Sequence, residues 1–337
     1  MVFTFLDLGF CLNFHRNKKK VSVGSNNCAE IQSLVDALSA WKIKTDNYIC
    51  RGTVSENKRN FKCSIDIEDC LPENIRNYFA KKATEAGPNC FNTGLVFSGL
   101  LPNLRHSTSE EIGFYMNSEL CKKRGPEEKP SPGDLGLISM VGINQDRPMV
   151  YSGQHAFIYL SEDFVYEKMD SRRTSPFTIA RKAETLKSYG LNPDESADEN
   201  KIYNKINREV SYYQCVSVSQ YLTETPNVPE ELMSLWNKML VEESCIEKFT
   251  MDRTPLRASS IKNIIDVSKA LTSYLQEIKK EPGKYDEEKS KFMIGSLQMK
   301  LKSISSALLG FVSEKKADPN LSIFAADLYK SIYGKSK

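Results

Sequence analysis

Residues 132–169, PGDLGLISMVGINQDRPMVYSGQHAFIYLSEDFVYEKM, decide the fold. The stretch contains three short runs that are typical of strands, at 135–141, 155–160 and 163–169. The last two runs are separated only by Ser161 and Glu162, a connection short enough for a hairpin. We therefore expect an antiparallel sheet in this part of the chain.

Segments with apolar residues at helical spacing lie on both sides of these strands. Those that precede the sheet predict helices at 28–41, 72–83, 90–101 and 109–121, with a hairpin around 50–63. Those that follow it predict helices, broken at prolines, at 230–243, 259–280, 287–313 and 323–333. The segment at 202–222 is compatible with either helix or strand.

These elements indicate an α+β protein in which a helix packs on an antiparallel sheet and a mainly helical extension follows. We expect four parts: a leader or disordered N-terminus at 1–24, a helix-hairpin-helix region at 25–86, a core at 87–222, and a helical C-terminal extension at 223–337.

Composition limits the class of protein. A chain of 337 residues with 40% apolar residues can bury a core, which argues against wholesale disorder. The net charge of +3 offers no strongly basic face for nucleic acid. No stretch approaches the roughly 20 apolar residues that span a bilayer. Residues 1–14 are apolar, but positive charges follow them and Asp7 interrupts them, so they would form an imperfect signal peptide at most.

The nine cysteines contain no C-x-x-C pair, and the chain has only three histidines. A zinc cage and a dithiol redox site are therefore disfavoured, and we expect neither a metal nor another cofactor. Cys50 and Cys63 flank a turn-like segment, so a disulfide across the hairpin is one expectation, and buried free cysteines are the other. A disulfide would suit export to the periplasm or cell envelope; a cytoplasmic location is the alternative.

Cys90 is the candidate nucleophile. A cysteine reacts as its thiolate, which a helix N-terminus or a neighbouring histidine stabilises. Cys90 follows the break Gly87-Pro88-Asn89 and begins an apolar run with helical spacing. At such a helix start, unpaired backbone N–H groups favour the thiolate and can receive an oxyanion.

His155 is the candidate base, because it stands at the entrance of the strand-like run 155–160. A third group must hold its imidazole in the required tautomer. Glu167, twelve residues later on the adjacent strand, would share a face with Val165 and could serve. A register shift of one residue would put Tyr166 there instead.

These pieces resemble the NlpC-type cell-wall cysteine peptidases, a compact branch of the papain-like fold. The resemblance covers about residues 75–170 and rests on Asn89-Cys90, Gly94-Leu95-Val96, Pro132-Gly133-Asp134-Leu135, the run 155–160 and Glu167. The PGDL turn and the HAFIYL strand are its most specific parts. The chain departs from the family in having Phe91-Asn92-Thr93 where the family has one serine, Asn89 where it has aspartate, and a carboxylate at Glu167.

The resemblance implies a cysteine hydrolase that cleaves a peptide-type amide through an acyl-enzyme, with a peptide or muropeptide of peptidoglycan as substrate. Acyl transfer on the same Cys-His pair, as in transglutaminases, is one alternative, and an inactive binding protein that retains the fold is another. Substrate contacts are expected from residues near the nucleophile and base, namely Tyr78, Asn89, Asn92, Arg105, His106 and Gln154. Arg105 and His106 would bind a substrate carboxylate or form a polar surface loop.

Overall fold

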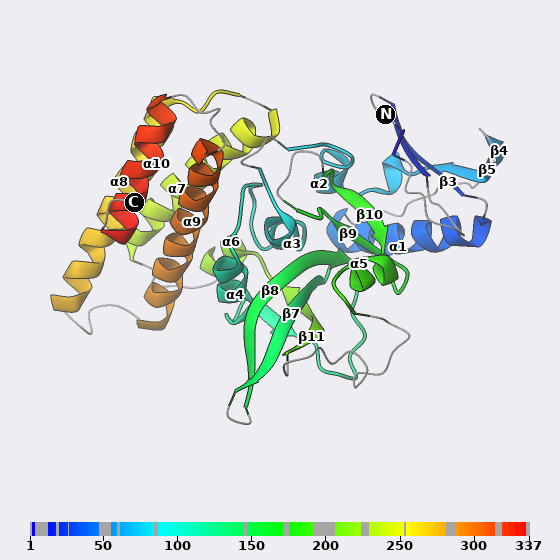
Figure 1. The fold of residues 1–337 in the computed structure, drawn as a ribbon, viewed down its shortest axis with the longest axis horizontal. Helices are drawn as coiled ribbons and strands as arrows, with labels where there is room; N and C mark the ends of the chain where they lie inside the picture. Colours follow the sequence, from blue (N-terminus) through cyan, green and yellow to red (C-terminus); the bar gives the residue numbers. More distant parts are fainter. Residues whose placement is uncertain are drawn as a thin grey trace.

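A computed structural model describes residues between Val2 and Gly334, with gaps at 4–12, 18–19, 26, 47–54, 59–60, 84–86, 145–146, 171–174, 192–205, 224–228, 253, 281–286 and 314–318. It contains helices and two antiparallel sheets, which confirms the α+β class. The central sheet lies between a group of C-terminal helices and a smaller N-terminal sheet (Figure 1).

The central sheet has six strands in the order β10-β9-β8-β7-β11-β6, and the pairs are antiparallel. In chain order these are β6 (Cys121–Lys123), β7 (Leu135–Asn144), β8 (Arg147–Tyr159), β9 (Phe164–Glu167), β10 (Thr178–Arg181) and β11 (Ile206–Cys215). The three strands expected from 132–169 are all present. The undecided segment at 202–222 divides into strand β11 and helix α6 (Val218–Thr223).

Residue alternation on β8 and β9 gives the sheet two buried faces. Ala156, Ile158 and Tyr166 join the main core, which also contains Leu95 and Phe97 of helix α3 (Cys90–Phe97). Phe157 and Val165 face the other way and form a smaller cluster with Leu186 of helix α5 (Lys182–Ser188). The sheet is therefore covered on one face by α3 and on the other by α5.

Gly94 explains how closely α3 approaches the sheet. A Cβ atom built on Gly94 would lie 3.0 Å from Cβ of Ala156 on β8, which is tighter than ordinary contact. Glycine is unfavourable within a helix, but at position 94 its missing side chain allows α3 to pack this closely on the sheet.

The helix expected at 72–83 is much shorter than predicted. Helix α2 covers only Glu73–Arg76. The chain after it pairs with the segment before β10, where Phe79 forms a β-bridge with Phe177. Ala80 has a φ of 58°, which no α-helix allows. Pairing with the segment before β10 has therefore overridden the helical pattern.

Helix α4 (Ser109–Met116) does begin as expected, because the hydroxyl of Thr108 accepts a hydrogen bond from the N–H of Glu111.

The N-terminal sheet contains part of the segment expected to be a leader. Its order is β1-β2-β3-β5-β4, with β1 (Val2–Phe3), β2 (Asn13–Asn17), β3 (Lys20–Ser25), β4 (Ser55–Lys58) and β5 (Phe61–Asp66). Helix α1 (Cys28–Asp46) packs on β3 and β5, and a short 3-10 turn (Glu68–Cys70) follows. Within the segment expected to be a leader or a disordered N-terminus, residues 13–17 and 20–24 are ordered and pair with neighbouring strands.

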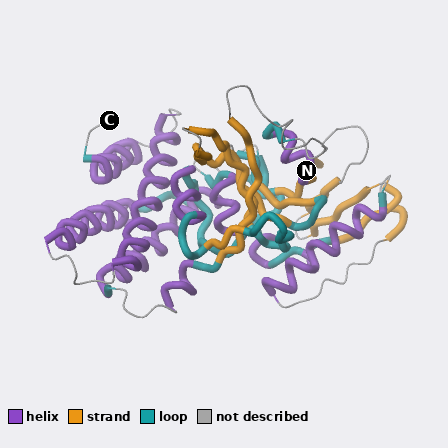
Figure 2. The backbone as a smooth tube through the Cα atoms, turned by 90° about the horizontal axis from the view of Figure 1, so that it is seen from below, coloured by secondary structure: helices purple, strands orange, loops and turns teal. Residues whose placement is uncertain are grey.

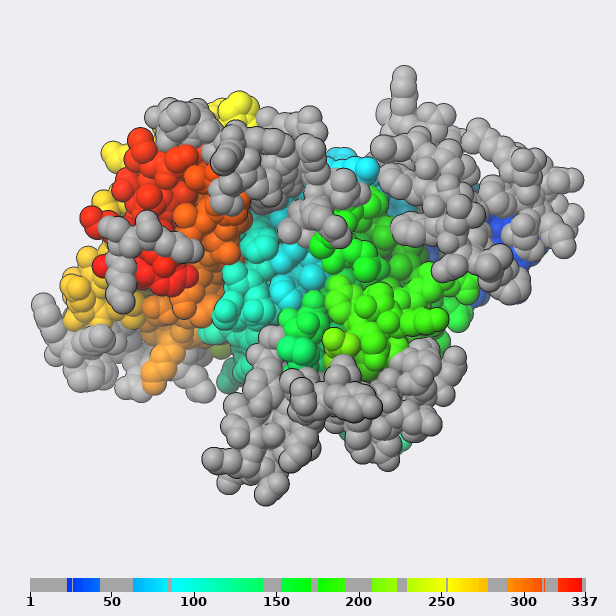
Figure 3. Space-filling model, viewed as in Figure 1, coloured from blue at the N-terminus to red at the C-terminus, as the bar shows by residue number. Residues whose placement is uncertain are grey.

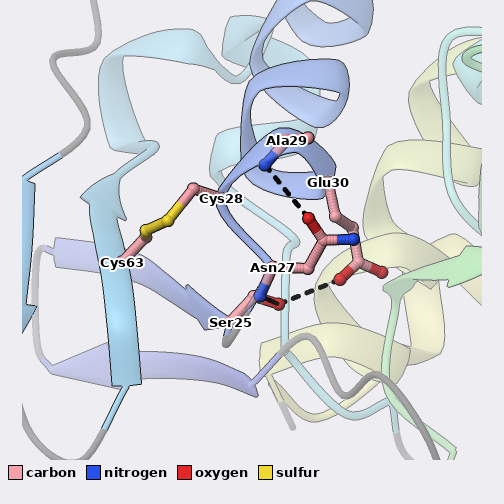
Figure 4. The surroundings of a disulfide bond; sticks show 6 residues. All are labelled: Ser25, Asn27, Cys28, Ala29, Glu30 and Cys63. Atoms are coloured by element: carbon pink, nitrogen blue, oxygen red, sulfur yellow. Dashed lines mark hydrogen bonds between the residues drawn. A yellow bond between two sulfur atoms is a disulfide. The ribbon is translucent and has the colours of Figure 1, made fainter.

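Two disulfides join described residues. Cys63 on β5 is bonded to Cys28 in the first turn of α1, so the expected pairing of Cys63 with Cys50 was wrong. Figure 4 shows this bond beside the Ser25–Glu30 hydrogen bond and the Asn27 side chain that accepts from the N–H of Ala29. Cys121 on β6 is bonded to Cys215, which lies directly opposite on β11.

The C-terminal helices are α7 (Glu230–Asp252), α8 (Ala258–Lys280), α9 (Glu287–Ser313) and α10 (Pro319–Tyr333). They gather at one end of the molecule, while strands occupy the middle and the opposite end (Figure 2). In the space-filling view the orange surface of α9 directly adjoins the turquoise surface of the segment that includes α4 (Figure 3). Apolar residues of α7, α8, α9 and α10 belong to the same core cluster as those of α1, α3 and α4. None of the described helices combines the length and the apolar character that crossing a bilayer requires.

Candidate active site

Cys90 is the first residue of α3, and Asn89 caps the helix. The Oδ1 atom of Asn89 accepts from the N–H of Asn92 (3.2 Å), and its Nδ2 donates to the carbonyl of Ser107 (2.7 Å). The backbone of Asn89 is extended, with φ of −108° and ψ of −173°, as the cap position requires. This cap leaves the first N–H groups of the helix, starting with that of Cys90, beside the thiol, where they favour negative charge.

Glu167 holds the His155 ring through its Nε2 atom. Its Nε2 atom donates to Oε2 of Glu167 at 2.7 Å, across the pair of strands β8 and β9. The other oxygen of Glu167, Oε1, accepts from the hydroxyl of Thr185 at 3.2 Å. This carboxylate is therefore anchored at both oxygens and fixes the imidazole ring.

The Cys90 thiol affects the pKa of the same imidazole. Burial alone would lower the pKa of His155, but the hydrogen bonds and charges of Cys90 and Glu167 outweigh it and raise the pKa to about 9. Nε2 is occupied by Glu167, and the buried Nδ1 makes no hydrogen bond with a described residue, so Nδ1 is the ring nitrogen left for the thiol. The order thiol, imidazole and carboxylate is that of a Cys-His-acid triad.

A β-bulge precedes His155. Ile138 on β7 pairs with His155, whereas the next residue, Ser139, pairs with Gly153, so Gln154 is an extra residue on β8. Bulges occur next to active sites because they re-aim a side chain. His155 thus lies within β8, directly after an irregularity, rather than at the start of the strand as expected.

The choice between Glu167 and Tyr166 is decided by the faces of β9. Glu167 bonds to His155, while Tyr166 packs edge-on against Phe97 of α3, with ring centroids 5.0 Å apart. The alternation inferred from the sequence, with Val165 and Glu167 on one face, agrees with this arrangement.

Helix α5 and its C-cap supply two residues that the sequence did not predict, Thr185 and Tyr189. The ring of Tyr189 stacks on His155 with centroids 4.7 Å apart and planes 16° apart. Burial, followed by the charges of Cys90 and Glu167, raises the pKa of the Tyr189 phenol above its usual range, which places the phenol near both groups. No motif in the sequence pointed to either residue, because their role depends on α5 covering the second face of the sheet.

A Schellman motif at the end of α5 fixes Tyr189. The N–H of Leu191 donates to the carbonyl of Leu186, and the N–H of Gly190 donates to that of Lys187. Gly190 has a φ of 71°, the left-handed conformation that this motif needs. Leu186 and Leu191 belong to the same apolar cluster, so the position of Tyr189 over His155 is well determined.

Cys90 carries a free thiol in a protein with disulfides. Among the described cysteines, Cys90 and Cys245 are free, whereas the others are disulfide-bonded. Cys90 is only 7% exposed, and His155 is fully buried. A hollow of about 650 Å³ between α1 and the β8–β9 turn is lined by neither of them. The described site is therefore nearly closed, with Cys90 contributing only a small exposed part.

The expected substrate contacts of Asn92, Arg105 and His106 are not supported by their positions. Asn92 is fully buried, and its Oδ1 accepts from the N–H of Arg105 at 2.9 Å. Arg105 is 1% exposed and pairs with Glu111, so it lies neither on a polar surface loop nor where a substrate carboxylate could reach it. Burial lowers the pKa of His106 to about 4, which leaves it neutral rather than cationic at pH 7.

Of the other residues expected to contact substrate, two have structural roles and one is partly exposed near His155. The hydroxyl of Tyr78 donates to Glu247 of α7, while its ring packs against Phe97 and Phe177. Asn89 is a buried helix cap. Gln154 is partly exposed beside His155 and is the member of the set best placed to meet a substrate.

Replacing Tyr189 should change the proton affinity of His155. An aromatic face 4.7 Å from the ring favours the imidazolium by about 1 kcal/mol, or about 0.7 pKa units. We expect Tyr189→Leu to lower the pKa of His155 by that amount, and Tyr189→Phe to leave it nearly unchanged. The chain has three histidines, so an NMR titration can follow each ring. Equal titration curves for the leucine variant and the parent would contradict this role.

In the part of the chain that the structure describes, no three His, Cys, Asp or Glu side chains lie together so as to hold a metal ion. The groups gathered at Cys90 are instead suited to nucleophilic and acid–base chemistry. Comparison of the chain with protein-family models, curated proteins and solved structures found no match.

Proposed function

We propose that the protein is a cysteine hydrolase with a papain-like core that cleaves a peptide-type amide. One observation carries the proposal: Cys90 at the start of α3 is a free thiol, and the Nε2 atom of His155, whose pKa this thiol helps to raise, is held at 2.7 Å by the buried carboxylate of Glu167. A structural cysteine needs no imidazole, and a structural histidine needs no thiol. The combination with an anchored carboxylate favours catalysis.

In the proposed reaction the Cys90 thiolate attacks the carbonyl carbon and forms a C–S bond. The N–H of Cys90 stabilises the oxyanion of the tetrahedral intermediate. The C–N bond then breaks as His155 gives its Nδ1 proton to the departing amine, leaving an acyl-enzyme. Water attacks this thioester while His155 takes a proton, and the free acid and the thiol are regenerated.

The surrounding architecture supports the papain-like, NlpC-type assignment. The nucleophile begins a helix that packs on an antiparallel sheet, and the base and its orienting group lie on the adjacent strands β8 and β9. The PGDL segment forms a hydrogen-bonded turn that leads into β7. In it Gly133 has a φ of 90°, and Asp134 accepts from Arg124 and from the N–H of Ser131.

The substrate class and the compartment are inferred from the resemblance and from the disulfides. The NlpC resemblance points to muropeptides, the peptide part of peptidoglycan. The disulfides Cys28–Cys63 and Cys121–Cys215 favour an oxidising compartment, which agrees with export to the cell envelope.

Product analysis separates hydrolysis from acyl transfer. The protein is incubated with defined muropeptides, and with acyl donors plus an added amine, and the products are identified by mass spectrometry. Hydrolysis predicts new carboxylate and amine ends whose yield does not depend on the added amine. A product joined to the amine would favour transferase chemistry. No turnover, together with a Cys90 no more reactive than an ordinary thiol, would favour an inactive binding protein.

Glu167→Gln should weaken catalysis and shift its pH dependence. The proposed acid is protonated His155, so activity falls as pH rises through the pKa of that ring, about 9. Glutamine retains a hydrogen-bond acceptor but removes the carboxylate charge that helps to raise this pKa. We expect kcat/KM to fall roughly 10²-fold and the alkaline limb to move down by about one pH unit.

The matched control is Glu162→Gln, because Glu162 is a surface carboxylate in the nearby β8–β9 turn that pairs with Lys182. Rate measurements from pH 5 to pH 10 compare both variants with the parent protein. An unchanged alkaline limb in Glu167→Gln would remove Glu167 from the proposed triad.

A further inference from the structure

Four buried charged residues link the C-terminal helices to the segment after α3. Glu243 on α7 lies between Lys300 on α9, with Nζ–Oε2 2.7 Å, and Arg105, with Nε–Oε1 2.5 Å. Arg105 also pairs with Glu111 on α4. None of the four residues is more than 1% exposed, and the two positive charges balance the two negative ones.

Arg105 connects this network directly to the nucleophile helix. Its backbone N–H donates to Oδ1 of Asn92, and one of its guanidinium nitrogens, Nη1, donates to the hydroxyl of Ser107 at 3.3 Å. Asn92 donates in turn to that hydroxyl at 3.2 Å. Ser107 also bonds through its backbone to Asn89, the residue that caps the helix immediately before Cys90.

Helix α9 contacts the same segment at a second point. The hydroxyl of Ser303 donates to Glu111 at 2.7 Å and accepts from the N–H of Thr108. Two of the C-terminal helices therefore hold the segment 105–108, which in turn holds the start of α3.

Stability alone is a weak reason for such a network, because burying charges is costly and well-packed apolar residues often do as well. Ion pairs in a fixed geometry do provide positional precision, which a nucleophile needs. We propose that Glu243 and Lys300 are positioning residues for Cys90: through Arg105, Ser107 and the cap Asn89, they fix the helix start that presents the thiol. The inference rests on the proposed role of Cys90 as nucleophile.

The test is the double variant Glu243→Gln with Lys300→Met in the full-length protein. It removes one charge of each sign and leaves Arg105 paired with Glu111. The control is Glu242→Gln, the same exchange at the adjacent buried position, where the carboxylate accepts from Asn263 on α8. The readout is the rate constant for alkylation of Cys90 by iodoacetamide from pH 5 to pH 9, with the thermal unfolding temperature measured alongside.

We expect the double variant to be alkylated at Cys90 roughly tenfold more slowly at pH 7, with the pH profile displaced to higher pH, because a nucleophile is sensitive to small misplacements. Glu242→Gln should keep the parent rate and profile. A purely structural role would lower the unfolding temperature of the double variant but leave the rate and pH profile of its folded form unchanged, and that result would overturn the inference.

Ser107→Ala provides a second variant if the double variant does not fold. It removes hydrogen bonds from the same path without changing any charge, and we expect roughly threefold slower alkylation. An unchanged rate in Ser107→Ala would also count against the inference. Slow, His155-independent alkylation of the parent protein would instead contradict the proposed function itself, so the two failures are distinguishable.

Discussion

Replacing Cys90 with serine should reduce amide hydrolysis by about 10⁴-fold or more, because a hydroxyl paired with the same imidazole is a far poorer nucleophile than a thiolate. Serine differs from cysteine in one atom, so the cap at Asn89 and the packing of α3 on the sheet should be retained. The measurement is kcat/KM on the muropeptide that the parent protein cleaves, with the unfolding temperature as a check on the fold.

The matched control is Cys245→Ser, since Cys245 is the other free thiol among the described residues and lies on α7. It should keep full activity. A Cys90→Ser protein that is as active as the parent would exclude covalent catalysis by this residue. Loss of activity in Cys245→Ser, with the fold retained, would contradict the assignment of Cys90 on α3 as the nucleophile.

His155→Ala should produce the second largest effect, a loss of about 10³-fold in kcat/KM together with slower alkylation of Cys90. The thiol loses the base that ionises it, and the departing amine loses its proton donor. The variant also removes the hydrogen-bond partner of one Glu167 oxygen in a buried site, so we expect it to be less stable.

His155→Gln separates these two consequences. An amide N–H can still donate to Glu167, but it cannot exchange a proton at neutral pH. We expect the glutamine variant to recover much of the stability and none of the activity. Full activity in a stable His155→Gln protein would contradict the role of His155 as base.

The central part of the fold follows from local patterns. The runs after PGDL alternate clearly, so the strands β7, β8 and β9 could be predicted, as could the shared face of Val165 and Glu167. The start of α3 was also predictable, because a Gly-Pro-Asn break before an apolar run is a local signal. The helices after Pro229 have long apolar periodicity, and their positions agree with it.

The features that the sequence did not predict depend on contacts between distant segments. Arg105 resembles a polar loop residue because its partners, Glu111 and Glu243, include one 138 positions away. Cys63 bonds to Cys28 rather than to Cys50 because α1 packs on β5. Thr185 and Tyr189 join the site only because α5 covers the second face of the sheet. Long-range packing, which has no local periodicity, decides each of these.

The most direct test of the account compares two thiols in one molecule. Iodoacetamide is added at pH 7 to the native protein, and the alkylation rates of Cys90 and Cys245 are followed by peptide mass spectrometry. Cys245 is the more exposed of the two, so exposure alone would make it react faster. Activation by His155 and the start of α3 predicts the opposite order, with Cys90 alkylated at least about tenfold faster and this advantage lost in His155→Ala. Slower alkylation of Cys90 than of Cys245, or a rate that does not depend on His155, would contradict the proposed active site.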